Sequence, residues 1–370
     1  MRLTSLLGGV TMLMLLLPAM PLGAQVTADN WESIVAKAKE EGVVVIHGAP
    51  GAGYRAAMVT AFNQAYPEIK VQFSGASNSV EIPKVIRERQ AGIFAWDIWI
   101  AGPGGTLNQL KPIGFFQPLK PFLRPELIRD EIWRGGFDFG WMDLDQELFF
   151  AFEATVQNPI MVNWDVVSPK ALSSIEDLIK PEFAGKIVWN DPRVTGSGNG
   201  SSQTLVRNLG EEKLAALYRN KVVYTINNQQ IGEWVVRGRY PIGVGLEAST
   251  LKEFQDQGIG MNVSPLPDEY FKSRQISVGF GSVGLIERAP HLNAATVYIN
   301  WLLSKEGQEA WVKIPRNSRR TDVVPAFPDL VPKPGVDYFI GQGEKNSDER
   351  TGLLRLAKEA IDGVAGRSGK

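Results

Sequence analysis

Apolar residues divide the first part of the chain into short runs that alternate with segments typical of helices. Apolar runs occupy 43–46, 69–73 and 96–101, and the segments at 54–66 and 81–91 separate them. Short apolar runs bounded by turn residues are typical of buried strands. Continuous apolar strands that alternate with helices occur in mainly parallel sheets covered on both faces. This part therefore predicts one α/β lobe.

A second alternation of the same kind fills the middle of the chain. We expect strands at 186–189, 222–224 and 241–246, and helices at 201–208, 229–237 and 249–257. Two extended connections, 149–163 and 277–286, join the two stretches, so the chain leaves the first lobe, builds a second and returns. The predicted fold class is α/β with two lobes, each a mainly parallel sheet flanked by helices. We assign 25–152 and 284–370 to lobe 1 and 153–283 to lobe 2, with the ligand cleft between them at the carboxyl ends of the strands.

The first 24 residues are typical of an export signal. Arg2 precedes an apolar run from Leu3 to Leu17, and Leu22-Gly23-Ala24 follows as a small-residue cleavage site. This order is that of a secretory signal peptide, and the run is shorter than the roughly 20 residues that span a bilayer. We therefore predict an exported, periplasmic protein from which residues 1–24 are removed.

Composition excludes several classes of function. Lys and Arg total 39 and Asp and Glu total 40, so the formal charge is −1, and −2 once Arg2 is removed. This balance argues against nucleic-acid binding, for which a basic excess is usual. Cysteine is absent, and His47 and His291 are the two histidines. Disulfides, thiolate metal sites and a cysteine nucleophile are thus excluded, and a zinc cage or a histidine base has few candidate residues.

The segment from Gly279 to Gly284 matches the G-x-G-x-x-G pattern of dinucleotide-binding loops. That pattern requires a helix directly after it, whose N–H groups face the pyrophosphate. Here Leu285 and Ile286 continue an extended run, and Pro290 follows. We interpret these glycines as part of a pliable connection between the lobes, because glycine tolerates the backbone changes of a hinge.

The loop from Asp191 to Ser202 is the richest candidate for ligand contact. It follows a strand, leads into a helix and holds glycines and hydroxyls, including Thr195, Ser197, Asn199 and Ser201. Helix N-termini carry unpaired N–H donors and positive potential, so they are suited to anions. The alternative is a flexible loop whose serine only caps the helix. It is not a P-loop, because no Gly-Lys-Ser/Thr ends it.

Other candidates follow the remaining strand ends. Most come from loops that would face the same cleft, and His47 is taken as a structural histidine. The expected ligand-binding set is Ala49, Tyr54, Ser77, Asn78, Trp141, Thr195, Ser197, Asn199, Ser201, Asn228 and Glu247. In this set Trp141 would stack on a ligand, and Glu247 would meet a cationic group.

Several segments resemble the periplasmic solute-binding proteins of ATP-binding-cassette importers, in the ferric-iron-binding branch. They are Trp31 to Val45, Phe62 to Val71, Asp177 to Ile187, Asp191 to Arg193, Ala289 to Gln308 and Ser318 to Val323. The resemblance covers nearly the whole mature chain. It implies the type II two-lobed fold, a monomer, a small-molecule solute, and permease and ATPase subunits as partners, with no catalysis and no cofactor.

The iron ligands of that branch are not matched in this sequence. Its ferric-binding members use a histidine, a glutamate and two adjacent tyrosines, and the corresponding places here hold Pro50, Gln90 and Ala248-Ser249. Ferric iron requires anionic oxygen ligands, which neutral side chains do not supply. We therefore expect a small polar, anionic solute and no metal site. A ferric-binding protein and a secreted hydrolase or lyase using Asp191 and Glu247 are the alternatives.

Overall fold

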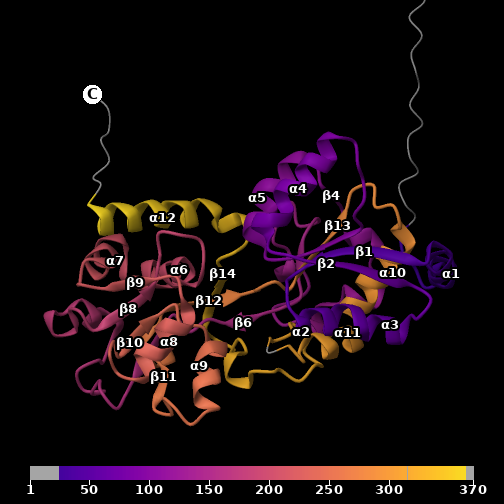
Figure 1. Cartoon of the computed structure of the whole chain (residues 1–370). Helices are drawn as coiled ribbons and strands as arrows, with labels where there is room; N and C mark the ends of the chain where they lie inside the picture. Colours follow the sequence, from indigo (N-terminus) through magenta and orange to yellow (C-terminus); the bar gives the residue numbers. More distant parts are fainter. Residues whose placement is uncertain (1–24, 315, 364–370) are drawn as a thin grey trace, which may run out of the picture.

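The computed structural model describes residues 25–314 and 316–363, and the expected signal peptide lies outside them. Two lobes lie side by side with a small sheet between them (Figure 1). In the described residues, no helix has both the length and the apolar character needed to cross a membrane.

The first lobe contains a six-stranded mixed sheet. β1 pairs in parallel with β2 and β3, and β13 runs antiparallel to β3, β4 and β5. The strands are β1 (Val43–Gly48), β2 (Lys70–Gly75), β3 (Ile98–Ile100), β4 (Phe116–Gln117), β5 (Phe150–Ala151) and β13 (Ser282–Ile286). The helices of this lobe are α1 (Trp31–Glu41), α2 (Ala52–Arg55), α3 (Ala61–Ala65), α4 (Asn78–Gln90), α5 (Pro103–Leu110), α10 (Leu292–Leu303) and α11 (Lys305–Trp311).

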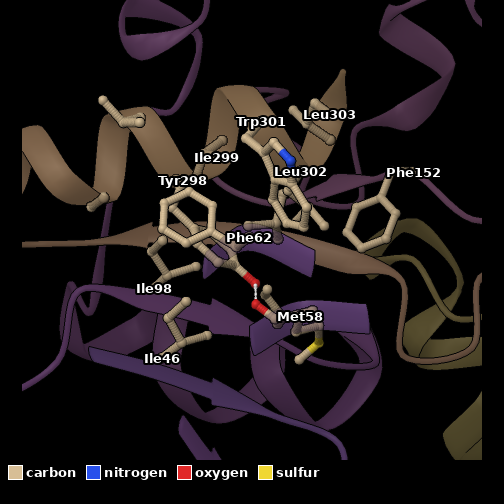
Figure 2. Packing of buried hydrophobic residues seen from close by; sticks show 14 of the residues in the cluster. Ile46, Met58, Phe62, Ile98, Phe152, Tyr298, Ile299, Trp301, Leu302 and Leu303 are labelled. Carbon is tan, nitrogen blue, oxygen red and sulfur yellow. Dashed lines mark hydrogen bonds between the residues drawn. The ribbon is translucent and has the colours of Figure 1, made fainter. Parts of the chain in front are cut away.

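Aromatic side chains of α3 and α10 close the core of the first lobe over the sheet. The Phe62 ring lies 4.7 Å from that of Tyr298 and 5.2 Å from that of Trp301, centroid to centroid. Figure 2 shows these rings above Ile46 of β1 and Ile98 of β3. The buried Tyr298 hydroxyl donates a 2.8 Å hydrogen bond to the Met58 carbonyl, which satisfies its polar atom. A close-packed core of this kind holds the strands and helices of the lobe, and the loops between them, in defined positions.

The second lobe contains a five-stranded sheet in the order β11-β7-β10-β8-β9. β8 pairs in parallel with β9 and β10, whereas β7 runs antiparallel to β10 and β11. The strands are β7 (Ile160–Asn163), β8 (Ile187–Asn190), β9 (Val223–Thr225), β10 (Ile242–Val244) and β11 (Val263–Pro265). The helices are α6 (Ser197–Leu209), α7 (Glu211–Tyr218), α8 (Asn228–Val236) and α9 (Ala248–Gln255).

A third sheet of three strands lies where the chain passes between the lobes. It consists of β6 (Thr155–Val156), β12 (Ser273–Ser277) and β14 (Asp337–Ile340). The chain runs from β5 of lobe 1 into β6, and later returns from β12 into β13 of lobe 1. These two passages lie next to each other, because the Phe152 N–H donates a 2.8 Å hydrogen bond to the Gly281 carbonyl.

The last helix differs from the sequence-based division of the lobes. Helix α12 (Ser347–Asp362) packs on α6 and α7, and Leu353, Ala357 and Ala360 lie buried in the second core. Figure 1 shows α12 along the second lobe. Its apolar face completes that core because the chain crosses back through β14 before the helix begins. The division at 152/153 and 283/284 remains our proposal, with α12 assigned to lobe 2.

Candidate functional site

The chain that follows β8 packs closely against the end of that strand because Gly198 lacks a side chain. A Cβ built on Gly198 would lie 1.6 Å from the Asn190 carbonyl oxygen, so this position accepts only glycine. The Gly198 N–H donates a 3.2 Å hydrogen bond to Asn190 Oδ1, and Gly196 precedes the helix as its N-cap. Helix α6 therefore begins at Ser197, four residues before the expected start, and its first turn lies against the end of β8.

Three of the predicted residues meet at the strand ends of lobe 2. Asn228 Nδ2 donates to Ser197 Oγ at 3.4 Å, and Asn228 Oδ1 accepts the Glu247 N–H at 3.1 Å. Ser197 Oγ in turn donates to the Gly245 carbonyl at 2.8 Å. The loops after β8, β9 and β10 thus form one polar network. We call Ser197, Asn228 and Glu247 the lobe 2 triad.

Other residues of the same loop are placed differently. Asn199 is 2% exposed and Ser201 is 3% exposed, so both side chains are buried in α6, whereas Thr195 is exposed. Asn199 lies two positions after Ser197 and therefore faces the other side of α6, whereas Ser201 lies one turn further along the side of Ser197 and is buried there. In this conformation, Thr195, Asn199 and Ser201 therefore do not form one exposed surface with the lobe 2 triad.

Trp141 is a core residue, which contradicts its predicted role in stacking on a ligand. Its side chain is 7% exposed and contacts the rings of Phe137 and Phe150 in the first core. The indole N–H faces Asp138 Oδ1 at 3.3 Å. The polar neighbours in the sequence suggested exposure, but they are turn residues that leave the ring itself buried.

In lobe 1, the predicted residues follow β1 and β2. Ala49 is buried and Ser77 is exposed, with its hydroxyl 2.9 Å from Ser79 Oγ. Asn78 Nδ2 donates to Thr106 Oγ1 at 3.1 Å, and its Oδ1 lies 3.4 Å from His47 Nε2. Burial lowers the pKa of His47 to about 4, so this ring is neutral at pH 7 and holds Asn78 in place as a structural histidine.

Tyr54 is a predicted lobe 1 residue that packs against two aromatic rings and whose pKa is affected by nearby charges. Its ring packs edge-on against Phe280 and Trp311, with centroid distances of 5.9 and 5.6 Å. Burial raises the pKa of the Tyr54 hydroxyl, the Arg316 guanidinium opposes the shift, and the charges of Glu153 and Glu247 add to it. Glu247 belongs to lobe 2, so the pKa of Tyr54 is affected by a charge of the other lobe.

Glu153 and Arg316 are functional candidates that the sequence interpretation missed. Glu153 lies between β5 and β6, is 0% exposed, and has a carboxylate oxygen 3.9 Å from the Arg316 guanidinium. Within the described residues, neither carboxylate oxygen has a hydrogen-bond partner, and the same holds for the adjacent Trp311 indole N–H. Buried carboxylates without partners are rare and costly, so this group requires an explanation.

The glycines of the G-x-G-x-x-G segment pack against this carboxylate. A Cβ on Gly281 would lie 2.3 Å from Glu153 Cβ, and one on Gly279 would lie 2.5 Å from Glu153 Oε1. Gly279 also has a φ of 49°, which favours glycine. The two passages between the lobes therefore meet at Glu153. Close packing accounts for these glycines without a nucleotide, and the hinge interpretation remains a prediction.

Burial and neighbouring charges both affect the pKa values of Glu153 and Arg316. Burial raises the pKa of Glu153 to about 7, and the Arg316 charge opposes the rise. Burial lowers the Arg316 pKa, but Glu153, Tyr54 and Glu247 together raise it above its usual range. We call Tyr54, Glu153, Arg316 and Glu247 the interlobe cluster. No single sequence motif identifies it, because its members come from four distant segments.

The places expected for iron ligands hold no metal-binding arrangement. Ala248 and Ser249 form the first turn of α9, and Gln90 ends α4. In residues 25–314 and 316–363, no group of three or more histidine, aspartate or glutamate side chains is arranged to hold a metal ion.

Comparison with known proteins supports the resemblance seen in the sequence. Residues 146–314 match the family model described as bacterial extracellular solute-binding protein. An uncharacterized protein of Haemophilus influenzae is 22% identical over 273 residues, which cover 68% of this chain and 70% of that protein.

Solved periplasmic binding proteins share the two-lobed fold over most of the chain. FutA (IdiA) of Trichodesmium, in complex with iron and citrate, aligns with a TM-score of 0.66 at 16% identity, over 86% of this chain and 99% of that one. AfuA of Actinobacillus pleuropneumoniae, with fructose-6-phosphate bound, aligns with a TM-score of 0.60 at 21% identity, over 87% of this chain and 99% of that one. The ferric binding protein of Campylobacter jejuni aligns with a TM-score of 0.63 at 16% identity, over 88% of this chain and 100% of that one. The chain therefore resembles extracellular solute-binding proteins and has the fold of periplasmic binding proteins.

Proposed function

We propose that this chain is the substrate-binding receptor of an ATP-binding-cassette importer. It captures a small polar solute with an anionic group in the periplasm and delivers it to a membrane permease and its ATPase. The observation that carries this proposal is the polar network of Ser197, Asn228 and Glu247 at the strand ends of lobe 2. The charge of Glu247 also affects the pKa values of Tyr54 and Arg316 of lobe 1. A solute between the lobes contacts both halves, so its binding favours a closed form that a permease can recognise.

The anionic group of the solute has two sources of support. Arg316 is half-buried and interacts with Tyr54, and a guanidinium in such a place forms strong, directional hydrogen bonds with carboxylate, phosphonate or sulfonate groups. Ser197 opens α6, whose N-terminus favours negative charge. The solute-binding neighbours provide a precedent, since AfuA was solved with a sugar phosphate and FutA with iron and citrate.

A thermal-shift screen of the mature protein tests this proposal. A ligand at 100 times its Kd stabilises the folded state by about 2.7 kcal/mol, which gives a measurable rise in Tm. We expect small organic anions to raise Tm in the wild type, and Ser197→Asp to abolish the rise through charge repulsion. Thr195→Asp is the matched control, because Thr195 is exposed and lies outside the triad. If only neutral sugars raise Tm and Ser197→Asp leaves that rise unchanged, the anionic solute is refuted.

Ferric iron is the second candidate because several structural neighbours are named as iron-binding proteins. The same screen should include Fe³⁺ with citrate or phosphate as a synergistic anion. We expect no stabilisation by iron, since Ala248 and Ser249 supply no anionic oxygen. A visible charge-transfer band on adding iron would instead establish the ferric alternative. Turnover of any hit by the purified protein would favour the hydrolase or lyase alternative.

A further inference from the structure

A cavity of about 200 Å³ lies in lobe 1, and none of its lining residues belongs to the lobe 2 triad or to the interlobe cluster. Of the eight described residues that line it, four are cationic and one, Glu126, is acidic. The cations are Arg124, Arg129, Lys305 and Arg320. A water molecule occupies about 30 Å³ in the liquid, so the cavity has room for a small ionic group. Its lining favours a negatively charged occupant.

Two of the lining side chains are buried and held by hydrogen bonds. Arg320 is 6% exposed, and its Nε and Nη2 each donate to a carboxylate oxygen of Asp322 at 2.8 Å. Its Nη1 donates to the Leu303 carbonyl, at the end of α10, at 3.0 Å. Asn300 is 3% exposed, and its Oδ1 accepts the Arg124 N–H at 2.8 Å. These bonds attach both segments to α10, so the walls of the cavity are held in defined positions.

Two of the cations are paired only loosely. Lys305 Nζ lies 3.8 Å from a carboxylate oxygen of Glu309, and Arg129 Nη1 lies 3.4 Å from one of Glu131. All four side chains are more than half exposed, and neither glutamate lines the cavity. Exposed ion pairs of this kind contribute little to stability, so either cation can turn toward another anion at little cost.

The other two cations are already neutralised. Arg124 Nη2 lies 2.5 Å from a carboxylate oxygen of Glu126, and Arg320 is paired with Asp322. The positive charge available to an occupant is therefore that of Lys305 and Arg129. Arg320 can still donate, because a guanidinium has five N–H groups and its three hydrogen bonds use three of them.

We propose that this cavity binds a phosphate group. A phosphate monoester carries about two negative charges at pH 7, which matches the two loosely paired cations. Guanidinium groups also donate paired hydrogen bonds to phosphate oxygens. The group belongs either to a small soluble phosphate or to the headgroup of a membrane lipid. This site is separate from the proposed solute site, and the proposal does not rest on the proposed function.

Isothermal titration near pH 7 in a phosphate-free buffer tests the site. The parent protein is the mature chain with Ser197→Asp, so that anion binding at the lobe 2 triad does not contribute. We expect inorganic phosphate and glycerol phosphate to bind and glycerol not to bind. Adding Arg129→Gln and Lys305→Gln together should weaken phosphate binding by about tenfold or more.

Lys37→Gln with Arg87→Gln is the matched control. It removes one exposed lysine and one exposed arginine of lobe 1 that do not line the cavity, so it changes the net charge equally. This control should bind phosphate as the parent protein does. Circular dichroism melts show whether each variant is folded.

Vesicles distinguish the two sources of the phosphate group. One sample contains phosphatidylcholine alone, and the other contains equal parts of phosphatidylcholine and phosphatidic acid. Flotation with the second sample that is lost in the Arg129→Gln, Lys305→Gln variant would identify a lipid headgroup. Binding of soluble phosphate without flotation would identify a small soluble phosphate. No binding of phosphate, glycerol phosphate or vesicles, or equal weakening in the control, overturns the proposal. The proposed function stands or falls separately, because its test depends on Ser197 and not on these cations.

Discussion

Glu153 shows how a single buried residue can make the stability of this protein depend on pH. Its pKa is raised from 4.5 to about 7, chiefly by burial, so the folded protein holds this proton more tightly than the unfolded chain does. The unfolded chain loses the proton near pH 4.5 and the folded protein near pH 7. Stability therefore falls as pH rises between these values, by about 3 kcal/mol in total, and no further above them.

Glu153→Gln should remove this component of the pH dependence. We expect the variant to be more stable than the wild type at pH 8, by up to about 3 kcal/mol, and to differ little from it at pH 4.5. Urea denaturation of both proteins at several pH values measures the difference. If the free energies of unfolding of the two proteins changed in parallel with pH, Glu153 would be ionised in the folded protein as readily as in the unfolded chain.

Trp141 leads to the opposite kind of prediction, because it is part of the core and not of the site. Trp141→Ala removes a ring that contacts Phe137 and Phe150, and the resulting cavity should cost about 3–5 kcal/mol. The affinity of the remaining folded protein for its solute should be unchanged. Urea denaturation gives the first quantity, and titration well below Tm gives the second. A loss of affinity in fully folded Trp141→Ala protein would instead show that Trp141 contributes to solute binding.

At the level of elements, local patterns predict most strands and helices but misplace their ends. Apolar runs place β1, β2 and β3 correctly within one or two residues. The helix expected to begin at Ser201 begins at Ser197, because Gly198, a poor helix former, is selected by its contact with Asn190. Asn30 is the N-cap of α1, without a side-chain hydrogen bond that caps the helix. Such ends depend on tertiary contacts, which local sequence patterns do not report.

Gly198→Ala tests the contact that sets the beginning of α6. Alanine favours helix over glycine by about 1 kcal/mol, yet here its Cβ would overlap the Asn190 carbonyl, so we expect marked destabilisation and loss of solute binding. Gly352→Ala in α12 is the matched control, since a Cβ there meets no atom within 4 Å. It should be neutral or stabilising by up to about 1 kcal/mol. Equal stability of the two variants, measured by thermal melts, would contradict the role of Gly198.

The arrangement of the whole molecule is where the sequence is least informative. The two-lobed α/β class follows from alternation and from the resemblance, and the triad follows in part from the rule that ligands bind at strand ends. The Glu153–Arg316 pair does not, because its members lie in segments that meet only where the chain passes between the lobes. The sequence-based division places α12 in lobe 1 rather than against α6 and α7 for the same reason. Helical periodicity indicates that a face is apolar, but not which core it covers.

The assignment of α12 to lobe 2 can be tested by local stability. Leu353→Ala removes a buried side chain from the second core and should cost about 2–5 kcal/mol. Hydrogen exchange should accelerate in α6 and α7, which contact α12, more than in α1 and α10 of lobe 1. Faster exchange confined to α1 and α10 would place the helix with the first lobe instead.

Binding of the solute should bring the two lobes together. Since the chain contains no cysteine, Arg87→Cys on α4 and Lys252→Cys on α9 provide two unique, exposed labelling sites, one in each lobe. Because the proposed solute would contact both lobes, we expect the distribution of distances between spin labels at these sites to shift to shorter values or to narrow when the most stabilising compound of the thermal-shift screen is added. A pair within lobe 1, Lys37→Cys with Arg87→Cys, should not change. In the Arg316→Gln variant, adding solute should leave the distance between labels at 87 and 252 at its solute-free value, because the guanidinium is the lobe 1 group proposed to bind the solute. An unchanged distance at saturating solute would mean that the lobes are already closed, and that capture depends on local movement of side chains around Arg316.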